Sequence, residues 1–280
     1  MTRGRRPDRR GQSARLKKRG VRKSDDTQSP DIWTGLREFT AARIGLARSG
    51  ASLATGPLLD LRLAHARARD AVHEPLDERW LLTELALLDS LVLTTASAVK
   101  DRSQYLMRPD LGRVLADADA ISLASHARPR FDVVFVMTEG LSARALAHAK
   151  PLLAEVLPAL VREGWSVAPL VLVRQGRVAI GDAVAAAVNA DISVMLIGER
   201  PGLSAPDSMG AYLTWRPHRQ TTDAERNCIS NIRPEGIGYA DAAFKVLHLL
   251  RAMRAQKISG VALKDTTDRL LVTGPNADKA

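Results

Sequence analysis

Three short apolar runs, separated by stretches of helical character, constrain the fold of this chain most strongly. They occupy residues 131–137, 166–173 and 192–197. Each run has the length of a strand and is almost continuously apolar, as is typical of strands buried on both faces of a parallel sheet. Because helices alternate with these runs, the sequence predicts an α/β fold with a mostly parallel sheet flanked by helices.

The stretches around these runs are predicted to be mainly helical. Apolar residues recur at helical spacing in residues 57–72 and 79–99, so a helical region is expected ahead of the sheet. Pro151 and Pro158 are expected to split or kink a helix over residues 142–163. The remaining expected elements are a short helix at 182–189, a more exposed strand at 211–215 and a helix at 239–259 that Gly260 ends.

The distribution of charge predicts a leader that does not join the folded part. Residues 1–30 hold 11 of the 41 Lys and Arg but only 3 of the 31 Asp and Glu, which leaves 30 basic and 28 acidic residues for the rest. Such a segment buries too little apolar surface to offset its ordering entropy. The predicted segments are a disordered basic leader (1–30), a helical N-terminal region (31–125), the sheet domain (126–265) and a frayed tail (266–280).

The loops after the three apolar runs are the predicted binding site. Ligands of parallel α/β sheets bind beyond the carboxyl ends of the strands. Those ends lead into Glu139-Gly140, residues 174–177 and residues 198–202, which we expect to lie side by side. The sequence carries no phosphate-binding glycine motif and no metal-ligand spacing of its histidines, which disfavours a nucleotide site and a protein-held metal.

Composition also bounds the location of the protein. No apolar stretch reaches the roughly 20 residues that a membrane-spanning helix requires, and no apolar export signal follows the basic leader. The single cysteine, Cys228, excludes an internal disulfide and fits a reducing compartment. We therefore expect a soluble, cytoplasmic protein without a membrane partner.

Several sequence blocks resemble the small subunit of ethanolamine ammonia-lyase. The main blocks are residues 197–203 followed by 227–232, then 173–178, and then 140–142, where the family commonly has Asp before the glycine and this chain has Glu139. Supporting similarity lies in residues 43–50, 63–72 and 105–113. The order and spacing of these blocks, which span nearly all of residues 31–265, make the resemblance specific.

The resemblance implies a Rossmann-like subunit that holds adenosylcobalamin against a larger, barrel-shaped subunit carrying the ethanolamine site. The implied reaction is the radical conversion of ethanolamine to acetaldehyde and ammonia, with no acid, base or nucleophile supplied by this chain. A higher-order heteromer is expected, and residence in a bacterial microcompartment is one location known in the family. The chain has no D-x-H-x-x-G motif, so the cofactor is expected to keep its own benzimidazole on cobalt.

The cobalamin-contact positions of the family map onto Val178, Glu199 and Cys228. Each position has an alternative interpretation. Val178 is equally consistent with a core residue that opens a helix, and Glu199 with an ion pair to Arg200 or Arg174. The sequence leaves open whether Cys228 contacts the cofactor through its backbone or its side chain.

Two other functions stay open at this stage. A nucleic-acid-binding protein would use the basic leader against phosphates, but the near-neutral remainder and an aromatic content of only 4% disfavour it. A stand-alone α/β protein that binds another small ligand is the second alternative. Both differ from the lyase interpretation in requiring no large subunit.

Overall fold

The computed structural model describes residues 32–40, 42–46 and 48–267. The predicted leader and most of the predicted tail lie outside these residues. The chain divides into two compact units, residues 1–45 and 46–280, and the predicted boundaries at residues 30, 125 and 265 stay predictions. In the first unit, α1 (Ile32–Arg37) is followed by a turn in which the Arg37 guanidinium donates to the carbonyl of Ile44 at 3.1 Å.

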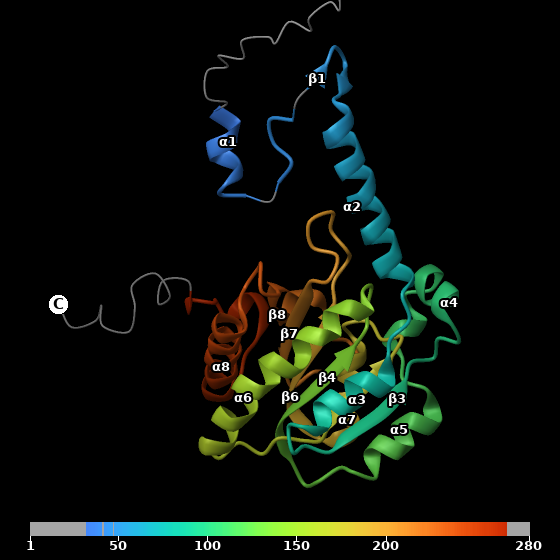
Figure 1. The fold of residues 1–280 in the computed structure, drawn as a ribbon. Helices are drawn as coiled ribbons and strands as arrows, with labels where there is room; N and C mark the ends of the chain where they lie inside the picture. Colours follow the sequence, from blue (N-terminus) through green and yellow to red (C-terminus); the bar gives the residue numbers. More distant parts are fainter. Residues whose placement is uncertain (1–31, 41, 47, 268–280) are drawn as a thin grey trace, which may run out of the picture. The chain divides into compact units, whose positions relative to one another are not determined.

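The second unit is built on a six-stranded sheet of order β3-β5-β4-β6-β7-β8 (Figure 1). The first four strands in that order are parallel, and β7 and β8 are antiparallel. The α/β fold is thus confirmed, with an antiparallel edge on the parallel sheet. The strands are β3 (Val92–Ala96), β4 (Phe131–Thr138), β5 (Leu170–Arg174), β6 (Ala190–Gly198), β7 (Met209–Trp215) and β8 (Arg226–Ile232).

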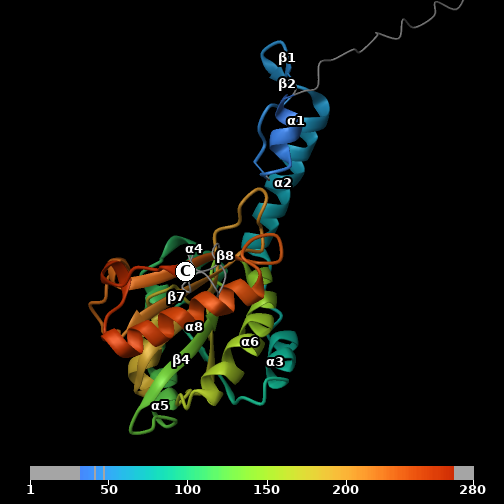
Figure 2. The ribbon, with the colours of Figure 1, turned by 90° about the vertical axis from the view of Figure 1, so that its left-hand side faces the viewer.

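Helices cover both faces of this sheet. One apolar core joins it to α3, α6 and α8 through residues such as Leu85, Leu153 and Leu249, and a second joins it to α5 and α7 through Leu123 and Val184. Figure 2 shows α6 and α8 side by side over the first of these faces. The α-helices are α2 (Thr55–His73), α3 (Glu78–Ala86), α4 (Arg102–Met107), α5 (Asp117–Ala124), α6 (Ala149–Arg162), α7 (Ile180–Val188) and α8 (Tyr239–Gln256).

Short elements complete the second unit. A hairpin of β1 (Arg48–Ser49) and β2 (Ser52–Leu53) precedes α2. The helix predicted over residues 142–163 is two elements, a 3-10 turn η2 (Ala143–His148) and α6. Pro151 lies in the first turn of α6, where its missing N–H costs no helical bond, and α6 continues through Pro158. The other 3-10 turns are η1 (Leu111–Arg113), η3 (Asp223–Glu225) and η4 (Gly260–Ala262).

The prediction of one helix over residues 79–99 was wrong in its second half. Helix α3 ends at Ala86, the backbone turns at Asp89 with a φ of 50°, and β3 then pairs with β5 along its full length. Side chains branched at Cβ, such as Thr94 and Thr95, lose rotamers in a helix and favour extended backbone. Apolar spacing alone does not separate a short buried strand from a helix.

Strand β8 has no counterpart among the predicted strands. Its sequence, Arg-Asn-Cys-Ile-Ser-Asn-Ile, is mostly polar, and only Arg226, Ile229 and Ile232 are buried. A strand at the edge of a sheet needs few apolar residues because one side of it faces solvent. Pairing with β7 therefore decides the structure of this segment.

Candidate binding site at the carboxyl ends of the strands

The three predicted loops lie side by side, because β4 pairs with both β5 and β6 in parallel. The Gln175 N–H donates to the Glu139 carboxylate at 2.9 Å, and the Leu141 N–H donates to the Gly198 carbonyl at 2.9 Å. Gly140 has a φ of 52°, and a Cβ there would lie 2.3 Å from the Gly198 oxygen. Only glycine permits this close approach of two strand ends.

A cavity of about 360 Å³ opens between the ends of β5 and β6. Val178 and Glu199, two of the three predicted contact residues, both line it. The cavity therefore joins an apolar side chain that follows β5 and a carboxylate that follows β6, the two strands on either side of β4. The complete lining is Tyr105, Leu141, Arg177, Val178, Ile197, Gly198, Glu199, Arg200 and Tyr212.

Glu199 is held by hydrogen bonds rather than by an ion pair. Its carboxylate accepts from the Ser208 hydroxyl, from the Ser230 hydroxyl at 2.6 Å and from the Asn231 N–H at 3.2 Å. Arg174 instead faces Glu78 at 3.5 Å, and within residues 48–267 neither it nor Arg200 pairs with Glu199. A carboxylate has about four acceptor positions, so this half-buried group retains capacity for a ligand donor.

Val178 combines the two roles that the sequence left open. It is half-buried two residues before α7 and packs against the core beneath α5 and α7. It also borders the cavity. One face of the side chain thus stabilises the core while another supplies an apolar wall.

Tyr105 supports the loop that carries Val178. Its fully buried ring contacts the guanidinium groups of Arg177 and Arg102, whose central carbons are 3.9 Å and 4.8 Å from the ring centroid. Its hydroxyl donates to the Gly176 carbonyl at 3.1 Å, and its own carbonyl accepts from Arg177 at 2.9 Å. Burial raises the pKa of Tyr105 to about 12, so the hydroxyl keeps its proton.

Sequence reasoning missed this supporting role. Tyr105 stands at the start of the block 105–113 that carries part of the resemblance, but nothing in a short helical segment indicates contact with a loop some 70 residues further on. The cation–π stack arises only when α4 packs under the β5 loop. The available signal was the presence of an aromatic residue in a chain that has few.

Cys228 lies outside the cavity formed by Val178 and Glu199. It is exposed on β8, opposite Tyr212 of β7, and it lines a neighbouring cavity of about 480 Å³ together with Ser230 and Lys245. Partial desolvation of the sulfur raises the pKa of the Cys228 thiol, and the charge of Glu199 acts in the same direction. Tyr212 connects the two places, because it borders the first cavity and interacts with the thiol.

Glu139 is buried directly after β4, where its carboxylate contacts the loop that follows β5. It is 4% exposed, and besides the Gln175 N–H it accepts from the Thr138 hydroxyl at 3.2 Å. Burial raises the pKa of this carboxyl, while the hydrogen bonds and the charge of Arg102 oppose the rise. The Glu139 carboxylate therefore mainly links the end of β4 to the end of β5 by hydrogen bonds.

Two kinds of feature are missing from the described part of the chain. No cluster of three or more His, Cys, Asp or Glu side chains in it is suited to hold a metal ion. None of the helices found there combines the length and the apolar character needed to cross a bilayer.

Comparison with known proteins gives the same family that the sequence blocks suggest. Residues 30–264 match the family model for the ethanolamine ammonia-lyase light chain. Among curated proteins, the chain is similar to the ethanolamine ammonia-lyase small subunits of Ralstonia nicotianae (50% identity, 86% of this chain and 90% of the relative) and Pseudomonas fluorescens (49%, 86% and 88%). That of Pseudomonas aeruginosa is 47% identical, over 87% of this chain and 90% of the relative. The chain therefore belongs to the ethanolamine ammonia-lyase light chain family.

Proposed function

We propose that this lyase subunit holds adenosylcobalamin at an interface with a large catalytic subunit, for the radical conversion of ethanolamine to acetaldehyde and ammonia. The observation that carries the proposal is the cavity at the strand ends. It brings together Val178 and Glu199, two positions that the resemblance assigns to cofactor contact. The family named by the comparisons supports the same function.

The residues of the cavity suit a large ligand with an apolar body and a polar rim. Val178, Leu141 and Ile197 supply apolar surface, and Glu199 supplies oriented acceptor oxygens. The Nε atom of Arg177 is buried and has no hydrogen-bond partner among the described residues. An unsatisfied buried donor costs about 1–3 kcal/mol, so a ligand acceptor at this place would be stabilising.

In the proposed function, the residues of this chain bind and orient the cofactor. Glu199 would accept from amide groups of the bound corrin, Val178 would pack against its apolar surface, and Cys228 would touch its edge beyond Tyr212. When bound, adenosylcobalamin supplies the radical chemistry itself. The chain contributes position and exclusion of water, while the substrate site belongs to the large subunit.

Co-expression with a candidate large subunit tests the proposal. We expect the two chains to elute together, to retain cobalamin with its visible absorption, and to release acetaldehyde from ethanolamine. A stable small subunit that binds no large subunit and no cobalamin would contradict the proposal. It would favour the alternative of a stand-alone binding protein.

The proposed location is the cytoplasm, inside or outside a microcompartment. Fractionation of cells that express the full-length chain with its large subunit distinguishes the two places. Retention of nucleic acid that is sensitive to salt and depends on residues 1–30 would instead support the nucleic-acid alternative.

A further inference from the structure

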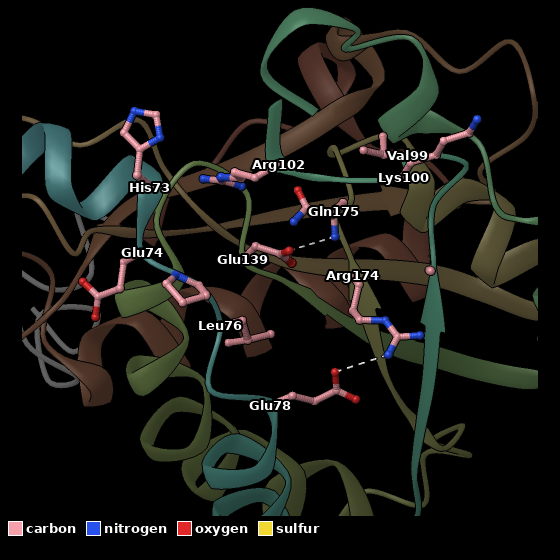
Figure 3. A pocket seen from close by; sticks show the side chains of 12 residues that line it. His73, Glu74, Leu76, Glu78, Val99, Lys100, Arg102, Glu139, Arg174 and Gln175 are labelled. Carbon is pink, nitrogen blue, oxygen red and sulfur yellow. Dashed lines mark hydrogen bonds and ion pairs between the residues drawn. The ribbon is translucent and has the colours of Figure 1, made fainter. Parts of the chain in front are cut away.

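A second cavity borders the same strand ends on the side of β3. Its volume is about 470 Å³, and pockets for small molecules typically measure roughly 300–1,000 Å³. Arg102, Glu139 and Gln175 form its polar end, and Leu76 and Val99 form an apolar wall. Figure 3 shows the three polar side chains gathered together, whereas the Arg174–Glu78 pair lies apart from them.

Two polar atoms at this end are buried without a partner in the described part of the chain. The Arg102 guanidinium donates to the carbonyls of Val72 at 2.8 Å and Gly140 at 2.7 Å, which leaves its Nη2 atom unpaired. The Gln175 Oε1 atom is unpaired as well. Buried polar atoms in folded proteins nearly always have partners. This pair therefore presents one donor and one acceptor that nothing in the described chain satisfies.

The backbone of Gln175 is held in an unusual conformation. Its φ of 56° lies in the left-handed region. Its N–H donates to Glu139, and its carbonyl accepts from the Ser97 hydroxyl at 2.7 Å. Residues other than glycine keep such a conformation only where their surroundings hold them, and these positions cluster at binding sites. The terminal torsion of a Gln side chain is broad, so the amide can turn toward a ligand without moving this backbone.

Charged side chains of both signs line the cavity, so its net charge does not select the ligand. The two unpaired atoms do: a carboxylate has no donor for the Gln175 Oε1 atom, and an ammonium group has no acceptor for the Arg102 Nη2 atom. A neutral group with a donor and an acceptor on neighbouring atoms satisfies both. That group is a primary carboxamide. The wall formed by Leu76 and Val99 suits a short aliphatic arm.

We propose that this cavity binds a primary carboxamide on a short aliphatic arm, with Arg102 donating to its oxygen and Gln175 accepting from its NH2 group. Two sources share this chemistry. One is an amide side chain at the edge of the corrin, in which case the inference rests on the proposed function. The other is a separate small amide.

The first experiment uses the full-length chain and propionamide, titrated by amide NMR, with propionate and propylammonium as charged analogues. We expect only propionamide to shift the resonances around residue 175. Gln175→Met should weaken this binding about tenfold or more, because it removes the acceptor at equal side-chain length. Gln220→Met, the same change at an exposed position, should leave it unchanged.

The second experiment measures cobalamin affinity in the complex with the large subunit. A loss of about tenfold in Gln175→Met, but not in Gln220→Met, would assign the carboxamide to the corrin. Unchanged cobalamin affinity with lost propionamide binding would assign it to a separate amide and leave the proposed function intact.

Failure of the inference is distinct from failure of the proposed function. Absence of propionamide binding by the folded wild-type chain, or equal binding of propionate, would overturn the carboxamide site whatever the cobalamin result. Gln175→Glu serves as a second variant. It preserves shape and polarity but adds a negative charge beside Glu139, and propionamide binding equal to wild type in both variants would also overturn the site.

Discussion

The parallel and antiparallel parts of the sheet contribute different things to the strand-end cavity. Residues at the ends of the parallel strands β5, β4 and β6 supply its apolar lining, and Gly140 allows the ends of β4 and β6 to approach each other closely. The antiparallel part supplies hydrogen bonds, since Ser230 and Asn231 of β8 orient the Glu199 carboxylate. The end of β6 thus places the Glu199 side chain, and β8, some 30 residues further along the chain, fixes its orientation.

A buried ion pair joins α7, which packs on the parallel strands β4 and β6, to β8 of the antiparallel part, and its removal should have the largest effect. Asp182 of α7 and Arg226 of β8 are both more than nine-tenths buried and form two hydrogen bonds of 2.6 and 2.7 Å. Asp182→Ala removes the one buried carboxylate that pairs with Arg226 among the described residues and leaves it only the exposed Asp223 at 3.5 Å, which should lower the free energy of unfolding by about 3–5 kcal/mol in urea titration.

The double variant sharpens this result. Asp182→Leu combined with Arg226→Met removes both charges, so most of the lost stability should return. A double variant as unstable as Asp182→Ala would show that other bonds of Arg226, such as that to Thr214 at 3.1 Å, hold the two parts together.

Glu199→Ala should have the next largest effect, on cofactor binding rather than on stability. A hydrogen bond to a charged group contributes roughly 1.5–3 kcal/mol, so cobalamin affinity in the complex should fall about tenfold or more while the subunits still assemble. Spectroscopic titration measures the affinity. Glu155→Ala, at an exposed position of α6, is the matched control, and an equal affinity in both variants would count against Glu199 as a ligand.

Tyr105→Phe tests whether Tyr105 holds the loop that follows β5 in place. The change removes the bond to the Gly176 carbonyl and should cost about 0.5–1.5 kcal/mol of unfolding free energy. Because the β5 loop carries Val178, we also expect a smaller loss of cobalamin affinity than in Glu199→Ala. An unaltered affinity in a destabilised variant would restrict Tyr105 to a structural role.

The smallest effect is expected from Glu139→Gln, and it depends on pH. Burial raises the pKa of Glu139 in the folded chain. The protonated carboxyl therefore contributes its whole stabilisation below the pKa it has in the unfolded chain, and this stabilisation is lost as the pH rises through the pKa of the folded chain. The variant cannot ionise, and its Oε1 still accepts from Gln175. The free energy of unfolding of the variant, relative to that of wild type, should therefore be higher at pH 8 than at pH 4.

Thermal unfolding at the two pH values measures this gain, with Glu155→Gln as the exposed control. A relative stability of Glu139→Gln that is the same at both pH values would show that Glu139 does not titrate differently in the folded chain.

The core strands were predictable because their burial leaves a direct trace in sequence. Phe131–Thr138 is buried almost throughout and reads as a continuous apolar run. The edge strands β3 and β8 leave a weaker trace, because each has one strand neighbour only and is buried over fewer of its residues. Residues 79–99 were therefore assigned to one helix, and β8 was not predicted.

The candidate site likewise has features that the sequence predicted and features that it did not. Parallel order and strand length in the sequence placed the three loops together and put Val178 and Glu199 near each other. Nothing local indicated that Tyr105 supports the β5 loop, that Ser208 and Ser230 hold Glu199, or that Cys228 faces a neighbouring cavity.

Apolar periodicity and ordered blocks of residues were enough to predict the class of fold, the strand ends proposed as the binding site, and the family. The tertiary structure decided which side chains share a cavity and which of their polar atoms have partners. Hydrogen bonds and ring contacts act over a few ångströms, between segments that the chain separates by tens of residues. Only packing brings such segments together.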